Sequence, residues 1–63
     1  MQEPTDREVH VAHLIATGMS NAEIAVALTI ELSTVESHVH HLLQKLGARS
    51  RVEIALWWFQ RGK

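Results

Sequence analysis

The chain is organised around one stretch of sequence, Ile30-Glu31-Leu32-Ser33-Thr34-Val35-Glu36-Ser37-His38-Val39-His40-His41-Leu42-Leu43-Gln44-Lys45-Leu46-Gly47. Apolar side chains recur in it with the spacing of one helical stripe: Val35, Val39, Leu42 and Leu46. Polar side chains recur with the same spacing on another face: Ser33, Ser37, His40 and Gln44. Gly47 predicts the end of this helix, because glycine readily adopts the left-handed backbone of a C′ residue. Such a helix can rest on a core and present its polar face to a groove, although an ordinary solvated surface helix has the same pattern.

Length and composition limit the remaining possibilities. The chain has 63 residues, 46% of them hydrophobic and 21% charged, which is the composition of one small globular domain. It has no cysteine, which excludes disulfides and thiolate metal sites. No apolar run approaches the roughly 18 residues of a membrane span, and no signal peptide pattern opens the chain. We therefore expect a cytoplasmic protein, or a piece of one, with no membrane contact.

Capping boxes predict where three further helices begin. A Ser or Thr followed three residues later by Glu opens each of these three helices: Thr5 with Glu8, Ser20 with Glu23, and Ser50 with Glu53. Gly18 predicts the end of the first helix, and residues 29–31 form a short break before the long one. Two helices joined by about three residues have the outline of a helix-turn-helix, here without a glycine in the turn. The expected fold is all-α, a four-helix helix-turn-helix domain over residues 5–61, with a lead-in at 1–4 and a tail at 62–63.

Several short motifs, in this order and spacing, resemble one family. They are Thr5-x-Arg7-Glu8, then Val11-x-x-Leu14-Ile15-Ala16-x-Gly18-x-Ser20-Asn21-x-Glu23-Ile24-Ala25-x-x-Leu28, then Thr34-Val35-x-x-His38-x-x-x-Leu42-x-x-Lys45-Leu46-Gly47, and last Ser50-Arg51-x-Glu53. Together they are similar to the LuxR-type helix-turn-helix domain, also called FixJ- or GerE-type. The resemblance covers nearly the whole chain, from Thr5 to about Trp58.

The resemblance implies a bacterial DNA-binding domain, usually the C-terminal output domain of a transcription regulator. In that family the third helix lies in the major groove, and the fourth commonly pairs with its copy in a second subunit. Double-stranded DNA and a second copy of the chain are therefore the expected partners, with no small-molecule ligand or cofactor. The residues implied to face DNA are Ser33, Thr34, Glu36, Ser37, His40 and His41, while Lys45 and Arg51 are implied to lie near the phosphate backbone.

The charge of the chain departs from this family's pattern. The net charge is −1 with neutral histidines, whereas DNA-binding domains are usually basic. Charging all five histidines would bring it to +4. Glutamate stands at position 36, where the family often has lysine. Glu36 could accept a hydrogen bond from a cytosine amino group, or it could close a capping box that begins at Ser33.

The histidines first suggest a metal site. His10 and His13 lie three residues apart, as do His38 and His41, so each pair shares a helix face. No cysteine or carboxylate cluster completes either set, and we expect no metal. We expect His38 to be packed and hydrogen-bonded, and His10 and His13 to face solvent. Four short helices also leave little room for a catalytic pocket, so we expect no enzymatic activity.

The last helix carries more apolar side chains than one small core can cover. Leu56, Trp58 and Phe59 cannot all be buried within one copy, so we expect them to form a dimerisation face. Two alternatives remain at this point. One is a degenerate helix-turn-helix domain that binds protein instead of DNA, and the other is a promoter-reading region of a sigma factor. The Lys45-Leu46-Gly47 motif and the pattern from Ser50 to Glu53 argue against the sigma factor.

Overall fold

The computed structural model describes residues 3–62, in which four helices follow one another without a strand. Their bounds are α1 Asp6–Ala16, α2 Asn21–Leu28, α3 Leu32–Leu46 and α4 Arg51–Arg61. The predicted all-α, four-helix class is confirmed. Residues 1, 2 and 63 lie outside the described part, and with them much of the predicted lead-in and tail. Within residues 3–62, no helix is long and apolar enough to cross a membrane.

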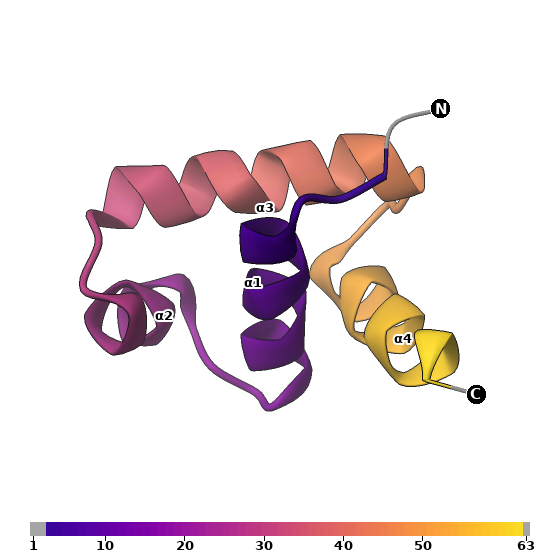
Figure 1. The fold of residues 1–63 in the computed structure, drawn as a ribbon, viewed down its shortest axis with the longest axis horizontal. Helices are drawn as coiled ribbons and strands as arrows, with labels where there is room; N and C mark the ends of the chain where they lie inside the picture. Colours follow the sequence, from indigo (N-terminus) through magenta and orange to yellow (C-terminus); the bar gives the residue numbers. More distant parts are fainter. Residues whose placement is uncertain (1–2, 63) are drawn as a thin grey trace.

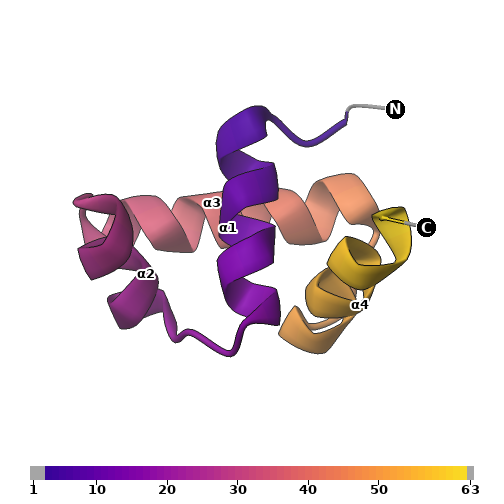
Figure 2. The same cartoon turned by 60° about the horizontal axis from the view of Figure 1, so that its bottom comes forward.

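The longest helix, α3, forms one side of the molecule, and the other three pack along it (Figure 1). α1 lies across α3 in both views, with α2 near one end of α3 and α4 near the other (Figure 2). α1 packs against all three other helices, whereas α2 and α4 meet through a side-chain hydrogen bond between their first residues, Asn21 and Arg51. The buried core joins side chains from every helix: Val11, Ala12, Ile15, Ile24, Ala25, Val35, Leu42 and Ile54. The core therefore holds the inner face of α3 and leaves its outer face free.

The first two capping boxes are present as predicted. The Thr5 hydroxyl accepts from the Glu8 amide at 3.2 Å, and the Glu8 carboxylate accepts from the Thr5 amide at 2.8 Å. Ser20 and Glu23 make the same pair of bonds at the start of α2, at 3.1 and 2.8 Å. Each box satisfies amides that have no partner inside their helix, so both helices begin where the local sequence predicts.

The third predicted box is wrong. Ser50 is the N-cap residue of α4, but its side chain accepts no capping hydrogen bond. The Glu53 carboxylate instead accepts from the amide of Arg49, one residue earlier, at 2.7 Å. The backbone φ at Ser50 is −156°, against −71° and −75° at the caps of α1 and α2, so the three caps do not share one geometry.

The helix-turn-helix connection is a three-residue turn between Leu28 and Leu32. α3 begins directly after Glu31, where the predicted break at residues 29–31 ends, and it ends at Gly47, whose φ is +63°. The alternative in which Ser33 and Glu36 form a capping box is wrong, because Ser33 already lies inside the first turn. The turn itself is made by Thr29, the only non-glycine residue among residues 3–62 with a positive φ, at +56°.

Candidate nucleic-acid interface

The outer face of α3 is a continuous polar surface. Val35 and Leu42 are fully buried beneath it, and Val39 and Leu46 are partly buried against the core. The predicted amphipathic helix is therefore confirmed. The exposed residues of α3 include every position predicted to face bases: Ser33, Thr34, Glu36, Ser37, His40 and His41, with Gln44 beside them. This face offers hydroxyl, imidazole, amide and carboxylate groups, which are the groups that hydrogen-bond base edges.

Lys45, which the resemblance implies near phosphate, is held by α1. Its Nζ donates to the Oε1 atom of Glu8 at 2.8 Å, and the Lys45 side chain is 19% exposed. The Nδ1 atom of His41 lies 3.8 Å from the other oxygen of the same carboxylate. Burial raises the pKa of Glu8, but the Lys45 hydrogen bond, the Thr5 amide and the Lys45 charge together bring that pKa below its ordinary value of 4.5. The carboxylate is thus ionised at neutral pH and faces a cation.

Arg51 is also engaged within the domain. One of its guanidinium nitrogens, Nη1, donates to the Oδ1 atom of Asn21, and Nη2 donates to the carbonyl of Met19, both at 2.6 Å. These bonds tie the start of α4 to the first residue of α2 and to the loop between α1 and α2. Both cations that the resemblance implies near phosphate therefore have partners inside the domain. Local spacing predicts a capping role for Glu8 and no partner for the Asn21 side chain, because Lys45 and Arg51 lie more than 29 residues away along the chain.

The histidines divide differently from the prediction. His10 is exposed as expected, but the prediction that His13 faces solvent is wrong. Its ring centroid lies 4.7 Å from that of Trp58, and its Nδ1 atom is buried without a hydrogen-bond partner. The reason is that α1 packs closely against α4, which covers the side of α1 that carries His13. His38 is half-buried against the domain, and no hydrogen bond of its side chain is found among residues 3–62.

Residues 3–62 contain no group of three or more histidine, cysteine, aspartate or glutamate side chains that could hold a metal ion. His38 and His41, which share a helix face in the sequence, lie on α3, and the Nδ1 atom of His41 lies 3.8 Å from the Glu8 carboxylate.

The outer face of α4 is apolar. Val52, Leu56 and Phe59 are 67%, 50% and 59% exposed, and their spacing of four and three residues places them on one stripe. The prediction that Leu56, Trp58 and Phe59 cannot all be buried in one copy is confirmed. Trp58 differs from the other two, because it is half-buried between His13 and Arg61, whose guanidinium carbon lies 5.4 Å from the ring centroid. We call Val52, Leu56 and Phe59 the α4 stripe.

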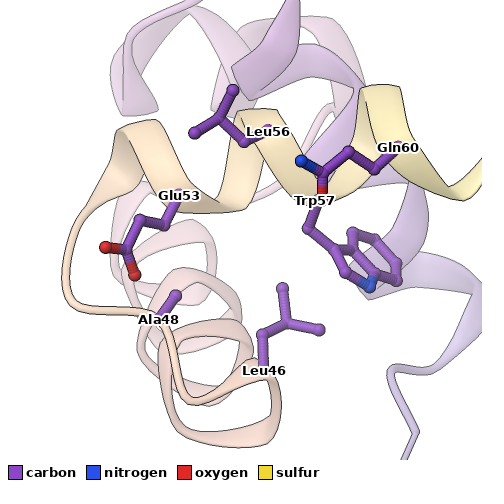
Figure 3. A pocket seen from close by; sticks show the side chains of 6 residues that line it. All are labelled: Leu46, Ala48, Glu53, Leu56, Trp57 and Gln60. Atoms are coloured by element: carbon purple, nitrogen blue, oxygen red, sulfur yellow. The ribbon is translucent and has the colours of Figure 1, made fainter.

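Two shallow hollows flank the α4 stripe. The larger, shown in Figure 3, is lined by Leu46, Ala48, Glu53, Leu56, Trp57 and Gln60. The other lies between α4 and the end of α1 and is lined by Ile15, Gly18, Met19, Arg51, Val52 and Ala55. Leu56 and Val52 each border one hollow, so the stripe and the hollows together form one uneven, mostly apolar surface.

Comparison with known proteins identifies the relatives of this domain. The family model described as bacterial regulatory proteins, luxR family, matches residues 4–58. The chain is 48% identical over 56 residues to the nitrate/nitrite response regulator protein NarL of Escherichia coli, covering 89% of this chain and 26% of NarL. It is 44% identical over 59 residues to a nitrate/nitrite response regulator protein homolog of Haemophilus influenzae, covering 94% of this chain and 28% of that protein. The response regulator protein VraR of Staphylococcus aureus is 43% identical over 56 residues, covering 89% of this chain and 27% of VraR. The chain thus spans little more than a quarter of the length of these relatives.

Proposed function

The chain belongs to the luxR family of bacterial regulatory proteins, a family of DNA-binding transcription regulators and not of enzymes, and we propose that it is the DNA-reading output domain of such a regulator. In this proposal α3 enters the major groove and two copies pair through α4, so that a dimer reads two half-sites. The domain would then act in the bacterial cytoplasm, where the chromosome lies.

One observation carries the proposal: the outer face of α3 is exposed and polar from Ser33 to Gln44, while its inner face is fixed by buried Val35 and Leu42. The major groove of B-DNA is wide enough to admit one α-helix. Ser33, Ser37 and His40 lie on the face that would meet base edges. Because the core fixes the inner face, these side chains would be presented from a rigid support.

The start of α3 offers further donors. Its N-cap residue, Glu31, makes no side-chain capping bond, so the first amides of α3 have no side-chain acceptor. The N-terminus of a helix carries a partial positive charge and free amide donors, which suit phosphate oxygens. We propose that Thr34 and these amides contact the backbone, which partly compensates for the shortage of free cations.

Electrostatics should nevertheless keep binding weak. Glu36 is exposed on the proposed groove face and repels phosphate, while Lys45 and Arg51 are held inside the domain. Each neutralised phosphate contributes about 0.9 to the slope of log affinity against log salt concentration. We therefore expect a smaller slope than that of more basic members of the family.

The α4 stripe supports the proposed dimer. Three large apolar side chains are exposed side by side on one stripe, and a contiguous exposed apolar patch often marks a protein–protein contact surface. In a two-fold dimer, the stripe of each copy would be covered by the same stripe of the other copy. We propose that pairing is weak in the isolated domain and is strengthened by DNA that carries two half-sites.

Titration of a fluorescently labelled duplex tests the placement of α3. Glu36→Lys should raise the affinity for every DNA sequence, because it removes a repulsion and adds an attraction. Lowering the pH from about 8 to about 6 should strengthen binding, since histidine gains its charge in this range. The double substitution His40→Ala with His41→Ala should flatten that pH dependence, although His41 also faces Glu8 and Lys45 within the domain.

The control is Glu3→Lys, which makes the same charge change at an exposed position before α1, outside the proposed groove face. If Glu36→Lys gained no more affinity than Glu3→Lys, and wild-type binding did not depend on pH, α3 would not be the groove helix. If no duplex bound at all while a partner protein changed the tryptophan fluorescence, the domain would be a protein-binding helix-turn-helix instead.

A further inference from the structure

Glu8 is the only charged or polar residue that is buried among residues 3–62, at 3% exposure. Its Oε1 atom accepts from the Thr5 amide and from the Lys45 ammonium, both at 2.8 Å. Its Oε2 atom lies 3.8 Å from the Nδ1 atom of His41. A buried carboxylate is tolerated only when it is paired and hydrogen-bonded. This one is bonded both to the amide of Thr5, at the start of its own helix, and to the ammonium of Lys45 on α3.

The partners of Glu8 lie on the helix that would read DNA. His41 and Lys45 are one turn apart on α3, and Glu8 lies in the first turn of α1, which crosses α3 (Figure 1). One carboxylate therefore connects the beginning of α1 to two positions on α3. Since both α1 and α3 are rigid elements, a bond at this crossing limits how α3 can slide or rotate on the core.

We propose that Glu8 is a positioning residue of the recognition helix, which acts through Lys45 to fix how α3 lies on α1 and to keep that ammonium away from DNA phosphate. This inference rests on the proposed function, in which α3 enters the groove. For Lys45 to reach a phosphate, it would have to leave a carboxylate whose side chain is 5% exposed. Breaking a buried pair costs far more than an exposed ion pair in water returns, so the pair should persist on DNA.

The chain contains a matched control for Glu8. Glu23 occupies the same third position of the other intact capping box, and its carboxylate accepts from the Ser20 amide at the same distance of 2.8 Å. Glutamine also serves in this position, so Glu8→Gln and Glu23→Gln both retain the capping acceptor and lose only the charge. Only Glu8 has an ammonium partner among the described residues.

Urea unfolding of the wild type and of these variants at neutral pH tests the pair without DNA. Glu8→Gln should lower the folding equilibrium constant, which is the ratio of folded to unfolded protein, at least tenfold more than Glu23→Gln does. In a Lys45→Gln background, this extra loss should disappear, whereas a Lys45→Arg background should retain most of it. Equal losses for Glu8→Gln and Glu23→Gln in the wild-type background would overturn the proposal.

The preference of the domain for one DNA sequence over another provides a second test, because a loss of stability alone would not change it. Two duplexes are compared, one of random sequence and one selected by the wild-type domain from a random library, under conditions where circular dichroism shows each variant folded. Lys45→Gln should leave the salt slope on the random duplex unchanged and should reduce the preference for the selected duplex at least tenfold. Arg49→Gln, at an exposed loop position, removes the same charge and serves as the control for net charge.

A fall of about 0.9 in the salt slope for Lys45→Gln would mean that Lys45 neutralises a phosphate, and the proposal would be wrong. An unchanged preference for the selected duplex would equally overturn the positioning role. If the wild-type domain bound neither the library nor the random duplex, the proposed function would fail, and the unfolding comparison would still decide whether Glu8 fixes α3 through Lys45.

Discussion

Removing the aromatic ring of Phe59 should abolish most self-association of the domain. Phe59 is 59% exposed at the end of the α4 stripe, where Val52 and Leu56 extend the same apolar surface. A phenylalanine side chain buries about 150–250 Å² when it is fully covered, so roughly 90–150 Å² remains to be covered on each copy. A two-fold interface uses this area twice, which at about 25 cal/mol per Å² corresponds to roughly 4.5–7.5 kcal/mol before the costs of association are subtracted.

Alanine keeps part of that area, and neighbouring side chains partly close over the gap. We therefore expect Phe59→Ala to weaken dimerisation by at least about 2.8 kcal/mol, which is a hundredfold change in the dissociation constant. Sedimentation equilibrium over a wide range of protein concentration measures this change directly. Far-UV circular dichroism should show no loss of helix, because the ring is more exposed than buried within one copy.

Val26→Ala is the matched control. Val26 is 81% exposed on α2, which meets α4 through the hydrogen bond between Asn21 and Arg51 and not through the α4 stripe. Its truncation should therefore leave the dissociation constant unchanged within about twofold. Pairing through the α4 stripe would be refuted if wild type and Phe59→Ala sedimented identically at all concentrations, or if Val26→Ala weakened pairing as much as Phe59→Ala.

Three further predictions concern stability. Burial raises the pKa of Glu8, but the bonds from Lys45 and the Thr5 amide outweigh it and hold that pKa below its ordinary value of 4.5. The contribution of Glu8 to stability is therefore fully present above that ordinary value and is lost as the pH falls through the lowered pKa. Acid titration of unfolding should therefore be flatter for Glu8→Gln than for wild type between these two pKa values. Thr29→Gly should stabilise the domain by about 0.5–1 kcal/mol in urea unfolding, because a β-branched residue is strained at positive φ, and a loss of stability would contradict this. Ser20→Ala should cost about 1 kcal/mol by thermal unfolding, whereas Ser50→Ala should cost markedly less, since only the Ser20 hydroxyl accepts a capping bond; equal costs would be evidence against this difference.

Most of the fold follows from short-range features of the sequence. The starts of α1 and α2, the amphipathic character of α3 and its end at Gly47 all depend on residues within one or two helical turns. Such features do not depend on how the helices pack against one another, so residue types and their spacing are enough to predict them. The exposed polar face of α3 belongs to the same group, because it is the complement of an apolar stripe.

Some short-range predictions failed because more than one partner was in reach. The hydroxyl of Ser50 and the carboxylate of Glu53 have the spacing of a capping box, but the Arg49 amide is also close to that carboxylate and donates a hydrogen bond to it. Ser33 and Glu36 have the same spacing, yet the chain had already begun its helix after Glu31. Sequence spacing indicates which bonds are possible, whereas the backbone path selects among them.

The sequence by itself determined four helices, their boundaries to within a residue or two, and which face of α3 is polar, because these depend on periodicity and on local hydrogen bonds. Only the tertiary structure decided that Lys45 and Arg51 are held by Glu8 and Asn21, and that His13 lies against Trp58. Long charged side chains have several partners in reach at similar free energy, water included. Which partner each side chain takes depends on how the four helices cross, and that crossing is set by the whole core at once.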